Sequence, residues 1–155
     1  MSADITFFLV PDDDRARAVR CCGPKGGLPA VAGHWFSAAD AVETWETYFV
    51  PPPPPTRRFL RRPRPQPDLW DRLRWIVPIS HDASGTFAVP DPVTHALAAA
   101  TPEELDDLAE QWTEQLRRED GDEMTDDDLA ALLRAVAQLA TTALDTGGTL
   151  YCCFC

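Results

Sequence analysis

The alternation of apolar and polar residues is most regular over the last third of the chain. Apolar residues recur there with the spacing of one helical face, first over 102–118 and again over 126–146. The first of these helices has Thr101 as its cap and Glu104 three residues later, the pattern of a capping box, and two glycines end the second helix. The apolar run 150–155 that follows predicts a strand.

The rest of the pattern predicts the other elements of one fold. Ile5 to Val10 is a continuous apolar run closed by proline and three aspartates, so we expect a buried strand that pairs with the C-terminal strand. Shorter patterns predict helices at 14–22, 38–49, 68–77 and 93–100 and strands at 35–36 and 86–89. The expected fold is a single α/β (α+β) domain over 1–155, with a small sheet that contains both terminal strands and packs against four to five helices.

The apolar faces of these elements predict a shared core. A chain of 155 residues, 45% of them hydrophobic, is long enough to bury one core and too short for two ordinary domains. The expected core members are Ile5, Phe7, Leu9, Trp45, Trp70, Leu105, Trp112, Leu133, Val136 and Leu150. The apolar stripe of the second C-terminal helix is expected to continue to Leu144.

The net charge of −11 lies in one stretch of the chain. Residues 103–128 hold thirteen acidic and two basic residues, whereas the remainder is neutral. Two interpretations remain open: a solvated helix surface, or a contact surface whose self-repulsion a basic partner would relieve. In the second case the contacts are expected from Glu103, Asp107, Glu110, Glu114, Asp122, Glu123, Asp126 and Asp127.

A proline- and arginine-rich segment spans 51–67. Five consecutive prolines followed by arginines exclude a helix or a central strand and predict an extended surface arm. Pro52, Pro55 and Arg57 fit the P-x-x-P-x-R pattern of a ligand for aromatic grooves, and a stiff spacer is the alternative. Nucleic acid is not an expected partner of this arm, because the overall charge is negative.

The five cysteines have no C-x-x-C spacing, and their odd number is unlike a disulfide framework. We therefore expect reduced thiols that fill apolar space, and no cofactor. The alternative is a thiol or metal-binding protein, whose metal ligands would come from Cys21, Cys22, Cys153 and Cys155. The reactive set in that case also includes Cys152.

No catalytic motif stands out, so a non-enzymatic protein is expected. His81, Asp82 and Ser84 lie close in sequence but lack the G-x-S-x-G context of a hydrolase. The chain has no apolar run long enough for a membrane span, and its first residues lack a basic signal-peptide region. These features predict a soluble, cytoplasmic protein without a membrane partner.

The order of the elements resembles that of a known family. The segment from Trp70 to Val77, the proline-bounded stretch after it, the helix that opens at Thr101 and the final helix and strand are similar in layout to the YfbM-like family of small uncharacterised bacterial proteins. That family has no assigned activity, so the resemblance implies no site residues.

The combined features lead to one functional expectation. A protein-binding module that covers a basic partner with its acidic helices fits the charge distribution best. A cytoplasmic bacterial inhibitor of the immunity or antitoxin type is one specific form of such a module. The pattern predicts neither the partner nor the oligomeric state.

Overall fold

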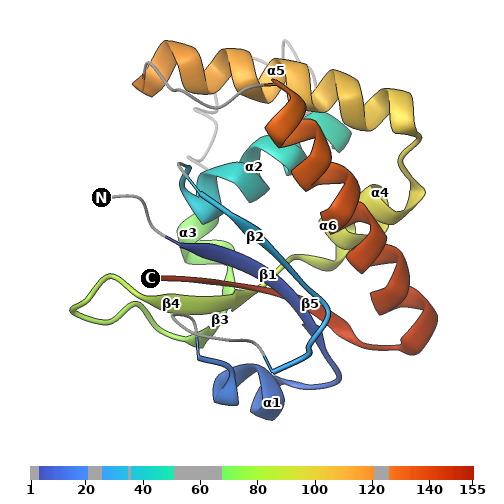
Figure 1. Ribbon diagram of the computed structural model, residues 1–155. Helices are drawn as coiled ribbons and strands as arrows, with labels where there is room; N and C mark the ends of the chain where they lie inside the picture. Colours follow the sequence, from blue (N-terminus) through green and yellow to red (C-terminus); the bar gives the residue numbers. More distant parts are fainter. Residues whose placement is uncertain (1–3, 21–25, 35, 51–67, 121–125) are drawn as a thin grey trace, which may run out of the picture.

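The computed structural model describes residues 4–20, 26–34, 36–50, 68–120 and 126–155. These residues form one five-stranded antiparallel sheet with helices against both of its faces (Figure 1). The protein is therefore a single small α+β domain, as the hydrophobic pattern predicts.

The two terminal strands lie side by side inside the sheet. The strands are β1 (Ile5–Val10), β2 (Ala30–Gly33), β3 (Arg74–Val77), β4 (Gly85–Ala88) and β5 (Thr149–Phe154). Their order is β2-β1-β5-β4-β3, so β5 is the central strand and pairs with both β1 and β4. The expected pairing of the two termini is confirmed, and all neighbouring strands are antiparallel.

The helices predicted over 38–49, 102–118 and 126–146 are confirmed to within two residues at each end. The helices are α1 (Asp13–Ala18), α2 (Ala38–Phe49), α3 (Leu69–Arg72), α4 (Asp91–Ala99), α5 (Pro102–Asp120) and α6 (Asp126–Thr146). The capping box of α5 is present: the hydroxyl of Thr101 accepts from the Glu104 N–H at 3.2 Å, and the Glu104 carboxylate accepts from the Thr101 N–H at 2.8 Å.

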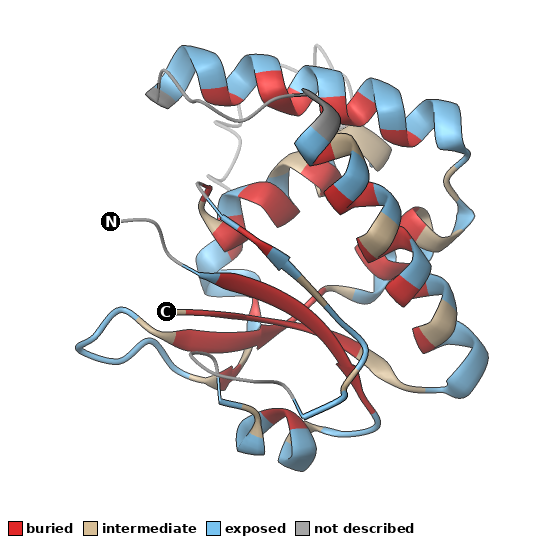
Figure 2. Cartoon of the chain, viewed as in Figure 1, coloured by how far each residue is buried: buried red, intermediate tan, exposed pale blue. Residues whose placement is uncertain are grey.

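The helices are divided unequally between the two faces of the sheet. Helices α2 and α6 contact one face, α4 packs against both of them, and α5 lies farther out on α2 and α6 (Figure 1). Helix α1 covers the opposite face. Burial follows this division, because α5 is buried only on its inner side and α1 is exposed almost everywhere (Figure 2).

The main core lies between the sheet and the helical layer. Nine of the ten expected core residues are buried, and aromatic rings form its centre. Trp45 of α2 and Trp112 of α5 meet edge to face, with their ring centroids 5.4 Å apart. The ring centroid of Phe7 of β1 lies 5.3 Å from that of Trp45. These contacts fix α2 and α5 relative to each other and to the sheet.

The helix expected over 68–77 is wrong in its second half. Helix α3 ends after one turn, Leu73 is extended, and Arg74–Val77 forms the edge strand β3 beside β4. The spacing of the apolar residues fits a helix, but the run of Trp, Ile and Val before Pro78 favours a strand, and pairing with β4 decides between them.

Trp70 is the one expected core residue that is not buried, with 36% of its surface exposed. A helix of one turn buries a narrow face, which Leu69 takes, and the next residue is rotated by about 100° away from it. The Trp70 ring instead stacks on Trp75 at 5.6 Å and meets Phe154 edge to face. The Trp70 ring therefore covers Trp75 and Phe154 at the surface of the protein and does not lie in the core.

Two further expectations need correction. Of the short strand expected at 35–36, Trp35 lies outside the described residues and Phe36 is not in a strand; the strand in this region is Ala30–Gly33, where the small residues pair with β1. Leu144 is 43% exposed although its helical phase matches the buried stripe. The last turn of α6 therefore extends past the elements that cover the rest of the helix.

This difference within α6 gives a matched pair of substitutions. Leu133 is fully buried and Leu144 is not, so Leu133→Ala should lower the free energy of unfolding by about 2 to 5 kcal/mol. Leu144→Ala should cost less than about 1 kcal/mol. Urea unfolding of the two variants measures both values, and equal costs would contradict the described position of α6.

Candidate functional site

An open groove of about 950 Å³ runs between α2 and α5 on the outer side of the helical layer. Four carboxylates line it, Asp40 and Glu43 from α2 and Glu114 and Glu119 from α5. One guanidinium, that of Arg118, is among the described lining residues, and it pairs with Glu114 one turn away. The described part of each wall therefore carries a net negative charge.

The local sequence explains why the α2 wall is acidic and well placed. The Ser37 hydroxyl caps α2 by accepting from the Asp40 N–H at 3.4 Å, which fixes where the helix begins. Asp40, Glu43 and Thr47 then share the polar side of α2, opposite the buried Trp45. The same helix thus anchors the core and presents carboxylates to the groove.

A side-chain hydrogen bond joins α2 and α5 beside the groove. The Tyr48 hydroxyl donates to Asp107 Oδ2 at 2.8 Å, whereas the Thr44 hydroxyl, which lies 3.4 Å from Gln115 Oε1, makes its shorter bond of 2.9 Å to the Asp40 carbonyl of its own helix. Asp107 Oδ2 also accepts from the Gln111 amide at 3.0 Å. Burial and the bond to Asp107 raise the pKa of Tyr48 to about 12, so this phenol stays protonated and remains a donor at neutral pH.

Four of the predicted contact residues form a single stripe on α5. Glu103, Asp107, Glu110 and Glu114 follow one another at i, i+4, i+7 and i+11, opposite the buried side of the helix, and all four are exposed. Glu114 also lines the groove, and Asp107 is held by Tyr48. Glu103 and Glu110 make no hydrogen bond or ion pair within the described part of the chain.

The other predicted contact residues either lie outside the described part of the chain or have side chains that are not described. Asp122 and Glu123 lie outside the described residues, as do Pro52, Pro55 and Arg57 of the predicted arm. Asp126 and Asp127 begin α6, but their side chains are not described.

The sequence pattern did not single out the α2 side of the groove. Asp40, Glu43 and Glu119 line it, yet none of them was an expected contact. The polar face of α2, with Asp40, Glu43 and Thr47 at i, i+3 and i+7, was a usable signal. The sequence alone does not show that this face of α2 lies beside α5.

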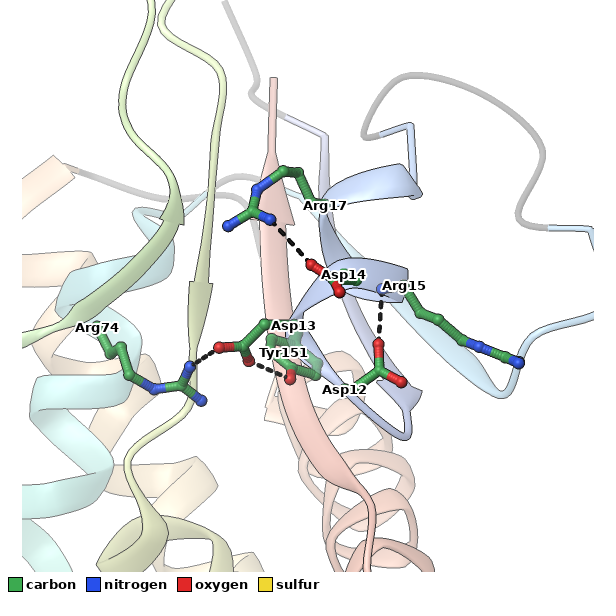
Figure 3. Close-up of polar contacts among 7 residues, drawn as sticks. All are labelled: Asp12, Asp13, Asp14, Arg15, Arg17, Arg74 and Tyr151. Carbon is green, nitrogen blue, oxygen red and sulfur yellow. Dashed lines mark hydrogen bonds and ion pairs between the residues drawn. The ribbon is translucent and has the colours of Figure 1, made fainter.

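A second polar cluster lies on the opposite face of the sheet, where α1 meets β3 and β5 (Figure 3). Asp13 pairs with Arg74 of β3 and accepts from the Tyr151 hydroxyl of β5 at 2.6 Å. The bonds from Arg74 and Tyr151 lower the pKa of Asp13, whereas burial and the bond to Asp13 raise the pKa of Tyr151. The Asp13 carboxylate therefore binds the Arg74 guanidinium and the neutral Tyr151 phenol at the same time.

The cysteines that the structure describes do not converge on one site. Cys152 and Cys153 are buried, but Cys152 faces the helical layer and Cys153 the other face of the sheet. Cys155 is disulfide-bonded, in a bond that involves neither of these two, so the expectation of reduced thiols is wrong for Cys155. Sequence spacing could not show this, because a disulfide depends on which distant cysteine approaches. Cys21 and Cys22 lie outside the described residues.

Two of the three residues that resembled hydrolase parts, Asp82 and Ser84, have a structural role. Asp82 accepts hydrogen bonds from the hydroxyls of Ser80 and Ser84 in the turn between β3 and β4. These bonds lower the pKa of Asp82. The carboxylate therefore closes the turn, together with the left-handed Ala83.

The described residues contain neither a metal-binding cluster nor a membrane-spanning helix. Within those residues, no group of three or more histidine, cysteine, aspartate or glutamate side chains is placed to hold a metal ion. None of the described helices combines the length and apolarity that crossing a membrane requires.

Comparison of the chain with protein-family models, with curated proteins and with solved structures gives no match. The layout resemblance to the YfbM-like family therefore stays a prediction that rests on the order of the elements.

The hydrogen bond across the groove can be tested through the ionisation of Tyr48. In a Tyr151→Phe background, which leaves one tyrosine, absorbance titration should show the phenol ionising at a pKa of about 12. Asp107→Asn should lower this pKa but leave it above the usual value of about 10, because burial is the larger cause.

The raised pKa of Tyr48 also makes the free energy of unfolding depend on pH. Because folding raises the pKa of Tyr48, its contribution to stability is present below pH about 10 and is lost as the pH rises towards 12. A phenol that ionises at the usual value in the folded protein, unaffected by Asp107→Asn, would mean that the bond is absent in solution.

Proposed function

We propose that the protein is a non-enzymatic binding module that holds a basic protein partner along the groove between α2 and α5. The observation that carries this proposal is the placement of carboxylates on both walls: Asp40 and Glu43 face the groove from one helix, and Glu114 and Glu119 from the other. A cationic side chain that enters the groove therefore meets negative charge from two sides.

The rigidity of the walls supports a binding role. The edge-to-face contact of Trp45 with Trp112 and the bond from Tyr48 to Asp107 hold α2 and α5 together below and beside the groove. Because the backbone of both helices is already ordered, binding a partner carries no cost of ordering it, which favours affinity. The groove thus offers a preformed negative surface.

The charge of the groove indicates what kind of partner fits. Lysine and arginine side chains are the complement of four carboxylates and one paired guanidinium. The volume of about 950 Å³ is sufficient for several side chains of one extended segment. The outward stripe of Glu103, Asp107 and Glu110 extends the negative surface beyond the groove, where it would attract the same partner at longer range.

A specific form of this proposal is an inhibitor of the immunity or antitoxin type, which covers the basic surface of its target. The alternative, a thiol or metal-binding protein, has less support, because the adjacent Cys152 and Cys153 face opposite sides of the sheet. A cytoplasmic location remains part of the proposal.

A pair of triple variants tests the groove. Asp40→Asn, Glu43→Gln and Glu119→Gln together neutralise three lining carboxylates, and Asp71→Asn, Asp91→Asn and Asp145→Asn neutralise three exposed ones that do not line it. Each variant is used to capture proteins from an extract of the source organism, and the association rate of the captured partner is then measured at several salt concentrations. The groove variant should associate about tenfold or more slowly at low salt and show a weaker salt dependence.

The control variant separates the groove from overall charge, since both triples change the net charge equally. Loss of binding in both would indicate non-specific attraction to an acidic protein. An unchanged association rate in a folded groove variant would exclude the groove as the contact surface.

A further inference from the structure

The disulfide of Cys155 links the end of the central strand to a distant part of the chain. The sequence holds five cysteines, of which Cys152 and Cys153 are free thiols. Within one chain, the partner of Cys155 is therefore Cys21 or Cys22. These two cysteines directly follow the described segment 4–20, which contains α1.

The end of β5 is well placed for a bond to this part of the chain. The backbone of Cys155 exchanges hydrogen bonds of 2.9 and 3.1 Å with that of Asp4, so the pairing of β1 with β5 continues to this residue. Because side chains alternate along a strand, Cys155 lies on the same side as Tyr151 and Cys153. This is the face that α1 contacts, through the bond from Tyr151 to Asp13 (Figure 3).

The distance from α1 to Cys155 is also within reach of the chain. Asp13 lies beside Tyr151, and Cys155 is four residues farther along the strand, a distance of about 13 Å. From Asp13 the helix rises about 7.5 Å to Ala18, and three further residues of extended chain span about 10 Å. A cysteine that follows α1 at this spacing can therefore reach Cys155.

We propose that the disulfide of Cys155 with Cys21 or Cys22 is a redox-sensitive brace: the domain is more stable when the bond is present, and thiol reductants remove this added stability. The bond closes a loop of more than 130 residues, which contains α2 and α5. A cross-link between residues so far apart in the sequence restricts the unfolded chain and so favours the folded one. The brace acts on the whole domain and is independent of what the groove binds.

The position of Cys155 makes its disulfide accessible to a small thiol. Cys155 lies beyond the last residue of β5 and is only partly buried, unlike Cys152 and Cys153. Two molecules of glutathione reduce the bond: the sulfur–sulfur bond breaks, two protein thiols form, and glutathione supplies the two electrons and two protons and leaves as its own disulfide. Accessible disulfides are the ones that such thiols reduce most readily, and disulfides of cytoplasmic proteins are mostly transient and redox-sensing.

Peptide mapping tests the pairing. The unreduced protein is unfolded in denaturant, its free thiols are alkylated, and mass spectrometry under non-reducing conditions identifies the linked peptides. The expected result is three alkylated cysteines and one cross-link, from Cys155 to the peptide that holds Cys21 and Cys22. Five alkylated cysteines, or a covalent dimer, would contradict the pairing.

Thermal unfolding with and without reductant measures the effect of the brace. Dithiothreitol should lower the melting temperature of the parent protein by about 10 °C, a shift typical of losing one stabilising disulfide in a domain of this length. Cys155→Ser should melt at the lower temperature under both conditions. The matched control is Cys152→Ala, which removes a free thiol from the main core and should keep the full reductant-dependent shift, whatever its own melting temperature.

Glutathione buffers test whether the brace responds to a cellular reductant. The folded protein is equilibrated with an increasing proportion of reduced glutathione, and the fraction of Cys155 still in the disulfide is measured by the same mapping. The bond should be lost progressively as reduced glutathione comes into large excess. A bond that survives this excess in full, or a melting temperature that dithiothreitol leaves unchanged, would overturn the proposal.

Discussion

The burial of β5 in the middle of the sheet is the constraint on which the rest of the structure depends. Its side chains alternate between two apolar layers, with Leu150 and Cys152 in the main core and Tyr151 and Cys153 in the second cluster. The strand follows every other element in the sequence, yet it pairs with the first strand, Ile5 opposite Phe154. The sheet is therefore completed by contacts of very long sequence separation, which is typical of slow folding.

The two layers on β5 give the two faces of the protein different properties. On one face, aromatic contacts centred on Trp45 and Trp112 fix the helices that carry the acidic groove. On the other, a six-residue helix packs Ala16 into a small apolar cluster and joins the sheet through the polar contacts of Asp13. The two faces of the sheet thus differ in the helices that cover them and share one central strand.

The elements that were predicted correctly are those that a short stretch of sequence specifies by itself. The capping box at Thr101, the apolar stripes of α5 and α6 and the continuous apolar strands at both termini all fall into this class. The segment 68–77 was mispredicted because its apolar spacing satisfies a helix, while pairing with β4 makes its second half a strand. The second wall of the groove and the cluster of Asp13 with Tyr151 depend on contacts between distant segments, which no local pattern records.

Hydrogen exchange of the intact protein, resolved to short peptides, tests the account most directly. The central claim is that β5 and the walls of the groove form one cooperatively folded unit, whereas α1 is a short helix with one buried side chain. Amides of β5 and of the central turns of α2 and α5 should then exchange only through global unfolding, with the full denaturant dependence of that reaction, whereas those of α1 should exchange faster and with little denaturant dependence. Exchange from α2 or α5 as fast as from α1 would contradict a preformed groove, and the same result for β5 would contradict its place at the centre of the fold.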